Sequence, residues 1–118
     1  MLQARPNAAH HAIAELARHL PRLTLVTQNV DDLHERAGSA GVLHLHGSLL
    51  QPRCFDCARP YREALAQAGM AEQQRCPPPR CPACRGLVRP GVVWFGESLP
   101  EDFLQQAFAA AAECDLLL

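Results

Sequence analysis

The sequence predicts an α/β protein into which a small metal-binding module is inserted. The first observation is an amphipathic pattern at helical spacing, followed by a short apolar run, which together make half of an α/β unit. The second is a section from residue 47 to residue 90 that holds five of the six cysteines and shows little apolar periodicity. The third is the return of strand and helix patterns after residue 90, which indicates that the first domain resumes there.

The composition is that of a globular protein and excludes several classes. Of the 118 residues, 48% are hydrophobic and 19% are charged, which argues against wholesale disorder. The net charge of -1 gives no electrostatic basis for nucleic acid or an anionic membrane as a partner. No apolar stretch approaches the roughly 20 residues that span a bilayer, and the N-terminal residues lack a signal-peptide core. A cytoplasmic location is therefore expected, where cysteines are more often metal ligands or buried thiols than disulfides.

The first element is an amphipathic helix over residues 8–19. Asn7 is suited to its N-cap, and Pro21 ends it. The apolar face recurs at helical spacing in Ala9, Ile13, Leu16 and Leu20. A strand over residues 23–26 follows, and its continuous apolar character is typical of a parallel sheet covered on both faces.

Shorter elements lie on either side of the cysteine-rich section. One or two helical turns are predicted over residues 31–37, ended by Gly38. Short strands are predicted over residues 42–45 and 91–95, where apolar residues gather again.

A second long helix is predicted to begin at Pro100. Glu101 and Asp102 then lie in its first turn, where the helix dipole favours acids. Its expected buried face consists of Phe103, Ala107, Phe108 and Ala111. The final CDLLL opens another apolar strand, which needs a neighbour, so we expect the chain to be an internal piece of a larger α/β protein.

Two CxxC pairs, separated by 23 residues, are the strongest chemical signal. They consist of Cys54, Cys57, Cys81 and Cys84. Four thiolates make a closed tetrahedral site for structural Zn²⁺, which leaves no open position for catalysis. A redox CxxC would not need a second copy, disulfides are disfavoured by compartment, and iron in place of zinc stays open. Cys76 has the wrong spacing to join the second pair, and Cys114 is expected to be a buried thiol.

Three polar clusters could carry chemistry. The first consists of Gln28, Asn29 and Asp31. It follows a strand end, where open α/β sheets bind ligands, and a capped loop is the alternative. His44 and His46 would share one face of a strand, so a metal pair, a strand cap and a general base all stay open. Residues 89–97 are either a core strand with aromatic filling or an edge that binds an extended peptide.

The sequence resembles the middle of a sirtuin, an NAD-dependent protein-lysine deacylase. The resemblance rests on four motifs in the same order: TQNVDDLHERAG, HLHGS, the two CxxC pairs and LVRPGVVWFGESLP. The resemblance extends from about Pro6 to Leu118, and the tryptophan of VVWFGE is similar to the bacterial branch that includes desuccinylases. It implies a partial Rossmann-like NAD-binding domain, formed by residues 1–46 and 91–118, with a zinc-ribbon module over residues 47–90. It further implies NAD as co-substrate, one structural Zn²⁺ per chain, and acylated lysine on proteins or peptides as substrate.

The resemblance also implies roles for individual residues. Gln28 and Asn29 would contact the nicotinamide ribose, while Val30 and Asp31 would hold the nicotinamide carboxamide. His46 matches the catalytic general base, which would take a proton from a ribose hydroxyl, and His44 would be an accessory. The segment expected to bind the substrate consists of Val93, Trp94, Phe95, Gly96 and Glu97.

Within that segment, Val93 would accept a hydrogen bond from the acylated lysine nitrogen, and Trp94 and Phe95 would wall the lysine channel. Gly96 and Glu97 would pair with the substrate backbone as an added strand. The glycine-rich phosphate-binding segment of sirtuins is missing from this sequence, so only half of an NAD site is expected. The alternative is a non-catalytic, zinc-stapled remnant that binds peptides. A zinc ribbon for nucleic acid is disfavoured by the lack of basic excess. The sequence does not indicate the acyl group, the protein targets or the oligomeric state.

Overall fold

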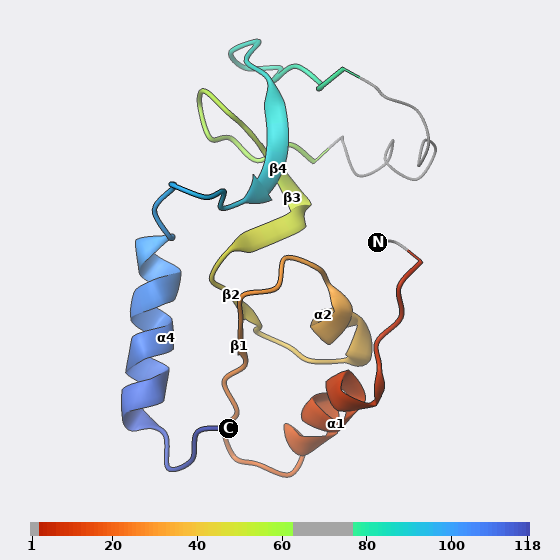
Figure 1. Ribbon diagram of the computed structural model, residues 1–118, viewed down its shortest axis with the longest axis vertical. Helices are drawn as coiled ribbons and strands as arrows, with labels where there is room; N and C mark the ends of the chain where they lie inside the picture. Colours follow the sequence, from red (N-terminus) through yellow and green to blue (C-terminus); the bar gives the residue numbers. More distant parts are fainter. Residues whose placement is uncertain (1–2, 63–76) are drawn as a thin grey trace. The chain divides into compact units, whose positions relative to one another are not determined.

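A computed structural model of the chain describes residues 3–62 and 77–118 (Figure 1). The chain divides into two compact units. The first unit consists of Met1–Gly47 and Val93–Leu118, and the second of Ser48–Val92. No helix in the described ranges is long and apolar enough to cross a membrane.

Helix α1 (Ala8–Leu16) opens the first unit. The Asn7 side chain caps it by accepting hydrogen bonds from the backbone N–H groups of Ala9 and His10, as the sequence predicts. The predicted end at residue 19 is wrong, because the last α-helical bond runs from the N–H of the C-cap Ala17 to the carbonyl of Ile13. The chain continues there in tighter turns, in which each N–H bonds to the carbonyl three residues earlier.

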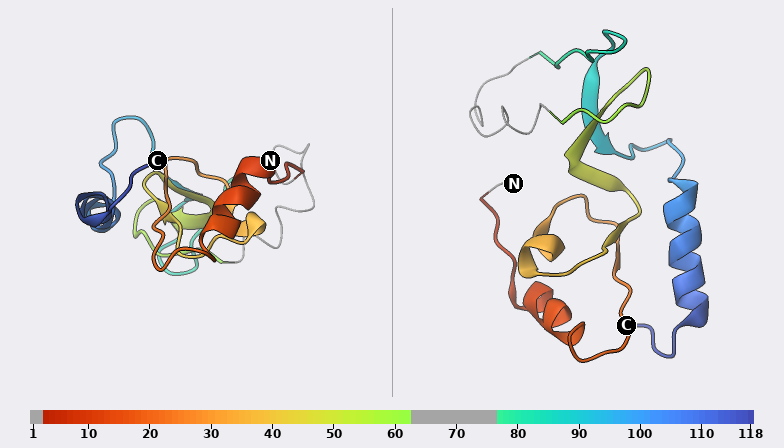
Figure 2. Two further views of the ribbon diagram at one scale, coloured as in Figure 1. Left: turned by 90° about the horizontal axis from the view of Figure 1, so that it is seen from below. Right: turned by 180° about the vertical axis from the view of Figure 1, so that it is seen from behind.

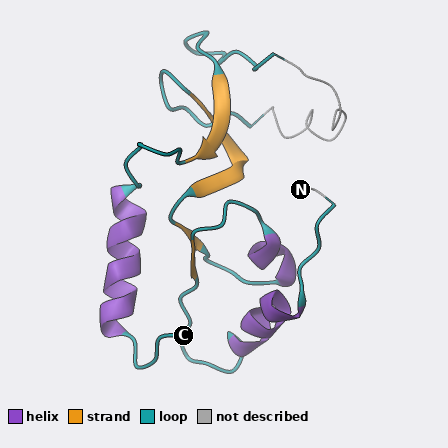
Figure 3. Cartoon of the chain, viewed as in Figure 1, coloured by secondary structure: helices purple, strands orange, loops and turns teal. Residues whose placement is uncertain are grey.

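Strands β1 (Val26–Thr27) and β2 (Leu43–His44) form a parallel pair (Figure 3). Val26 lies opposite Leu43, and Thr27 opposite His44. The strand predicted over 23–26 is misplaced, since β1 shares only Val26 with it and ends at Thr27, and β2 is shorter than the run predicted over 42–45, because only these residues pair. The predicted α/β order is present, since α1 precedes β1 and the chain between the two strands forms helix α2.

Helix α2 (Leu33–Ala37) is a short helix that packs against α1, as the views in Figure 2 show. It ends at Gly38, whose φ of 105° places it in the left-handed region that a side chain makes unfavourable. The predicted helical turns and their glycine stop are therefore confirmed, although the helix begins two residues later than expected.

Helix α4 (Glu101–Glu113) begins after Pro100 with Glu101 and Asp102 in its first turn, as predicted, and it contacts β2. Its predicted buried face is wrong, because none of its residues is buried. Phe103 is 40% exposed and Phe108 is 67% exposed. Within the helix only Leu104, Ala107 and Ala110 are half-buried, so the two phenylalanines that were expected to be covered face solvent. The predicted CDLLL strand is also absent, since those residues pair with no strand and Leu116–Leu118 are exposed.

The second unit is built on strands β3 (Gly47–Cys54) and β4 (Val88–Val92), which pair in a two-stranded sheet. The strand predicted over 91–95 is misplaced, because β4 ends at Val92 and a turn follows. Gly91 allows β4 to pair with β3 near Gln51. A Cβ there would lie 1.9 Å from the backbone oxygen of Gln51, so only glycine lets the chains approach. The buried apolar residues of the described chain are all in this unit: Cys54, Cys81, Val88 and Val92.

Candidate functional site

The four CxxC cysteines converge in the second unit. Their Sγ atoms all lie within 4.8 Å of one another. The Sγ atoms of Cys54 and Cys84 are 3.4 Å apart, and those of Cys57 and Cys81 are 3.7 Å apart. A disulfide needs about 2.05 Å, whereas sulfurs on a tetrahedral Zn²⁺ at about 2.3 Å lie roughly 3.8 Å apart. The four cysteines are therefore positioned to bind a structural zinc, as the sequence predicts.

The two CxxC turns share one backbone conformation. The N–H of Ala58 donates to the carbonyl of Cys54 at 3.1 Å, and that of Arg85 donates to Cys81 at 2.9 Å. Ala58 and Arg85 each follow the last cysteine of a pair and have positive φ values of 58° and 66°. The N–H of each leading cysteine also bonds to the carbonyl five residues later. This repeated turn aims both thiols of each pair at the same point.

The electrostatics of the thiols favour a cation at the cluster. The backbone N–H groups of Cys84 and Ala83 lower the pKa of Cys81 to about 7. The N–H of Gly86 lowers the pKa of Cys84, but the neighbouring thiols outweigh it and raise this pKa to about 12. The thiolate of Cys81 is thus stabilised, while the ionisation of Cys84, which lies among the other thiols, is opposed. A bound dication removes this repulsion and allows all four to ionise.

The structure tests the prediction for only one of the two remaining cysteines, Cys114. Cys114 is exposed, and its thiol donates to the carbonyl of Ala111 at 3.2 Å. The expectation of a buried thiol is wrong, because the strand that would have covered it is absent among the described residues. Cys76 lies outside the described residues.

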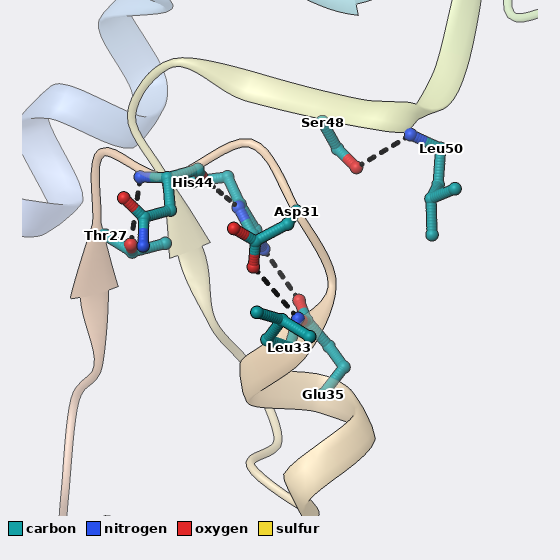
Figure 4. A network of polar contacts seen from close by, with 8 residues as sticks. Thr27, Asp31, Leu33, Glu35, His44, Ser48 and Leu50 are labelled. Carbon is teal, nitrogen blue, oxygen red and sulfur yellow. Dashed lines mark hydrogen bonds and ion pairs between the residues drawn. The ribbon is translucent and has the colours of Figure 1, made fainter. Parts of the chain in front are cut away.

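In the polar loop after β1, side-chain oxygens hydrogen-bond to backbone N–H groups, while two side-chain amides are available. Asn29 donates its N–H to Thr27 Oγ1 at 3.0 Å, and Leu33 donates its N–H to Asp31 Oδ1 at 3.0 Å (Figure 4). The side-chain amides of Gln28 and Asn29 lie on exposed residues and make no hydrogen bond within the described ranges. The capped loop that was the alternative prediction is therefore present in the backbone, while the side-chain amides of Gln28 and Asn29 can still bind a ligand.

His44 joins this loop to α2 through both ring nitrogens. Its Nε2 lies 2.7 Å from Glu35 Oε1, and its Nδ1 lies 3.0 Å from the carbonyl oxygen of Asn29 (Figure 4). Burial lowers the pKa of His44, but the hydrogen bonds to Glu35 and Asn29 and the charge of Asp31 together raise it above its ordinary value. The role of Glu35 was missed from sequence, because nothing in a nine-residue separation indicates that the two side chains meet.

His46 lies in the turn after β2 rather than on the strand. The prediction that it shares a strand face with His44 is wrong, since β2 ends at His44 and Gly47 follows with a φ of 72°. His46 is half-buried, and its carbonyl accepts from the N–H of Val93 at 2.9 Å. Because β1 and β2 run parallel in register, the amide loop and the His46 turn both leave the carboxyl edge of one sheet.

Residues 94–97, which follow Val93, form a closed turn. Glu97 donates its N–H to the carbonyl of Trp94 at 3.0 Å, and its carboxylate accepts the Trp94 N–H at 3.0 Å. Trp94 is 54% exposed, and Phe95 is fully exposed. The turn thus presents two aromatic side chains to solvent next to the His46 turn.

Comparisons with known proteins identify the family. The family model described as Sir2 family matches residues 1–118. NAD-dependent protein deacylase 1 of Pseudomonas aeruginosa is 64% identical over 119 residues, which is 100% of this chain and 48% of that protein. The NAD-dependent protein deacylase of Methylococcus capsulatus is 54% identical over 121 residues, or 99% of this chain and 46% of that protein. The chain spans about half the length of the curated relatives it matches.

Comparison with solved structures supports the same family assignment. The chain matches a Sir2 homologue–NAD complex with a TM-score of 0.77 and 49% identity, covering 91% of this chain and 40% of that one. It matches Sir2 bound to an acetylated peptide with a TM-score of 0.78 and 36% identity, covering 95% of this chain and 46% of that one. These likenesses confirm the predicted α/β fold with a Rossmann-like domain and a zinc-binding insertion. This chain belongs to the Sir2 family, the sirtuins that its motifs resemble.

Proposed function

We propose that this chain carries the catalytic base, half of the NAD site and the zinc module of an NAD-dependent protein-lysine deacylase. The supporting observation is the shared edge of β1 and β2, from which the loop with two unbonded amides and the His46 turn both emerge. Ligands of open α/β sheets bind at this edge. The proposed domains are residues 1–46 with 91–118 for NAD and residues 47–90 for zinc.

In the proposed site, Gln28 and Asn29 contact the nicotinamide ribose, and Val30 and Asp31 hold the carboxamide. NAD supplies, when bound, the ribose carbon that receives the acyl oxygen as nicotinamide leaves. His46 accepts a proton from a ribose hydroxyl, a task suited to an imidazole near neutral pH. One water is consumed when the amine leaves the acyl carbon, and the products are free lysine, nicotinamide and O-acyl-ADP-ribose.

The acylated lysine is proposed to bind along residues 93–97. Val93 accepts from the lysine nitrogen, and the exposed rings of Trp94 and Phe95 wall the lysine side chain. Pairing of Gly96 and Glu97 with a peptide backbone would replace the two hydrogen bonds that close the turn between Trp94 and Glu97. We also propose a cytoplasmic location, where a reducing environment keeps a four-thiolate cluster from oxidising.

The test is NAD affinity, measured by calorimetry on the zinc-loaded chain. Asn29→Ala is expected to weaken NAD binding about tenfold, because it removes a hydrogen bond of about 1–1.5 kcal/mol. Gln51→Ala is the matched control, since it removes an exposed amide from the second unit. Equal affinities for the Asn29→Ala variant and the unaltered chain would contradict the proposed site. Peptide binding without any NAD binding would favour the non-catalytic remnant.

A further inference from the structure

His44 is unusual in that both of its ring nitrogens face acceptors. Nε2 faces the Glu35 carboxylate at 2.7 Å, and Nδ1 faces the Asn29 carbonyl oxygen at 3.0 Å. A carboxylate oxygen and a carbonyl oxygen are both hydrogen-bond acceptors, so each contact needs an N–H on the ring. A neutral imidazole has one N–H, whereas the imidazolium has two. Only protonated His44 satisfies both contacts.

The carboxylate determines which contact is lost when His44 is deprotonated. A hydrogen bond to a charged oxygen is roughly twice as strong as one to a neutral carbonyl. Neutral His44 therefore keeps its proton on Nε2, toward Glu35, and turns the lone pair of Nδ1 toward the Asn29 carbonyl. The contact with Asn29 changes from attractive to repulsive.

The Asn29 carbonyl is a sensitive place for such a change. The backbone of this residue is held at its N–H by Thr27 Oγ1 and at its carbonyl by His44. Its peptide link to Val30 lies in the middle of the loop that the proposed function assigns to the cofactor. Releasing one of the two anchors frees the residues on either side of that link.

We propose that Glu35 and protonated His44 form a clamp that positions the cofactor loop through the Asn29 carbonyl, and that the loop is released when His44 loses its proton. The cofactor part of this inference depends on the proposed function, but the clamp itself does not. Glu35 and His44 act as positioning residues, because the contact to the loop is made through a backbone carbonyl.

The surroundings of His44 favour the protonated form. The carboxylates that act on it are Glu35 on α2 and Asp31 in the loop, and together they raise its pKa. Strand β1, which pairs with β2, contributes no titratable side chain. Helix α4 also contacts β2, but among the described residues no charged side chain of α4 bonds to His44. The acids of α4 are Glu101, Asp102 and Glu113.

The clamp can be tested by NMR on the zinc-loaded chain from pH 5 to pH 9. Two-bond ¹H–¹⁵N spectra of the His44 ring are expected to show two protonated nitrogens at low pH and the Nε2–H form above the midpoint. The backbone amides of Asn29 and Val30 are expected to shift with the same midpoint. A single protonated nitrogen at pH 6, or loop amides that do not follow the ring, would overturn the proposal.

Two variants make the test specific. In Glu35→Gln, the new amide can donate to Nε2, so neutral His44 can carry its proton on Nδ1 and still hold Asn29. The loop shifts should then disappear, and the neutral ring should switch to the Nδ1–H form. His44→Asn places an uncharged donor near the Nδ1 position, so it should hold the loop at every pH. Glu15→Gln, which removes the partner of exposed His19, is the matched control and should change nothing at the loop.

NAD affinity separates this inference from the proposed function. In the unaltered chain, NAD binding should weaken about threefold to tenfold above the His44 midpoint, as expected for one lost hydrogen bond. Glu35→Gln should abolish this pH step. If the step survives in Glu35→Gln, the positioning role is wrong even where NAD binds. If no variant binds NAD while the NMR pattern is as described, the proposed function fails and the clamp stands.

Discussion

At the scale of single residues, the backbone conformations of a few positions determine whether the second unit can form. Gly91 lies in β4 with its Cβ position against the backbone of β3, and the two positive-φ residues after the CxxC pairs shape the zinc turns. None of these features is visible as an apolar pattern. They are geometric requirements, and each can be tested by a substitution that adds or removes a single Cβ atom.

Gly91→Ala is expected to destabilise the chain by about 2 kcal/mol or more, because the new Cβ would lie 1.9 Å from the Gln51 backbone oxygen. Urea unfolding of the zinc-loaded protein measures the change. Gly41→Ala is the control. Gly41 has nothing within 4 Å of its Cβ position, so only its φ of 63° adds a cost, of about 1 kcal/mol. Equal losses for the two variants would show that close approach at Gly91 is unimportant.

Ala58→Gly is expected to stabilise the chain by up to about 1 kcal/mol, since Ala58 has a φ of 58° that glycine adopts without strain. Ala83→Gly is the matched control in the second CxxC turn. Its φ is not positive, so the substitution should destabilise instead. Thermal unfolding of both variants would show the opposite signs, and a lowered midpoint for Ala58→Gly would contradict the argument.

At the scale of elements, side-chain contacts between α2, β2 and the loop after β1 give the first unit a pH-dependent stability. The His44–Glu35 contact raises the pKa of His44 in the folded chain above the value of 6.5 expected in the unfolded one. A raised pKa for a histidine means that folding is favoured by the protonated form. This stabilisation is complete below about pH 6.5 and is lost as the pH rises through the folded-state pKa.

Glu35→Gln should therefore cost more stability at pH 6 than at pH 9. The side chain of Glu35 is 43% exposed, so the difference between the two pH values is expected to be about 0.5–1 kcal/mol. Urea unfolding of both proteins at each pH gives this difference directly. Because both proteins carry the same cysteine cluster, its own pH dependence cancels in the comparison. An equal cost at pH 6 and pH 9 would refute the assigned protonation.

The elements also show what local sequence signals can predict. Asn7, Gly38 and Pro100 fixed helix ends correctly because each acts on its own neighbouring backbone groups. The strand after residue 90 was misplaced because β4 is defined by its pairing with β3, which lies outside its own local pattern. The face of α4 was misjudged because burial depends on a covering element, not on the helix itself.

At the scale of the whole molecule, the two units are organised around different principles. The first unit packs α1 on α2 and places polar loops at one sheet edge. The second has few buried apolar residues, two of which are zinc-ligand cysteines. The CxxC spacing predicted that cluster fully, whereas the Glu35–His44–Asn29 contact needed the fold to bring three segments together.

Zinc is therefore expected to supply much of the stability of the second unit. Binding of a structural zinc contributes on the order of 10 kcal/mol, and in such small sites this is also folding free energy. Metal analysis should give one zinc per chain, and a strong chelator should release it together with the dispersed amide resonances of β3 and β4. The Cys54→Ser variant should lose zinc and the dispersed signals even without chelator. The Cys114→Ser variant, which changes an exposed cysteine, should retain both zinc and structure. Well-dispersed β3 and β4 signals in the metal-free protein would contradict this dependence.

The most direct test of the account is nicotinamide release by the zinc-loaded chain, supplied with NAD and an acetyl- or succinyl-lysine peptide. His46→Ala removes the proposed base, and His11→Ala removes an exposed histidine from α1 as the matched control. Because the chain carries only half of the NAD site, any release is expected to be slow; we predict that it depends on the acylated peptide, falls at least about a hundredfold in His46→Ala and is unchanged in His11→Ala. Undiminished release in His46→Ala would remove this residue from its role. No release by a folded, zinc-loaded chain would show that these residues alone do not make the deacylase.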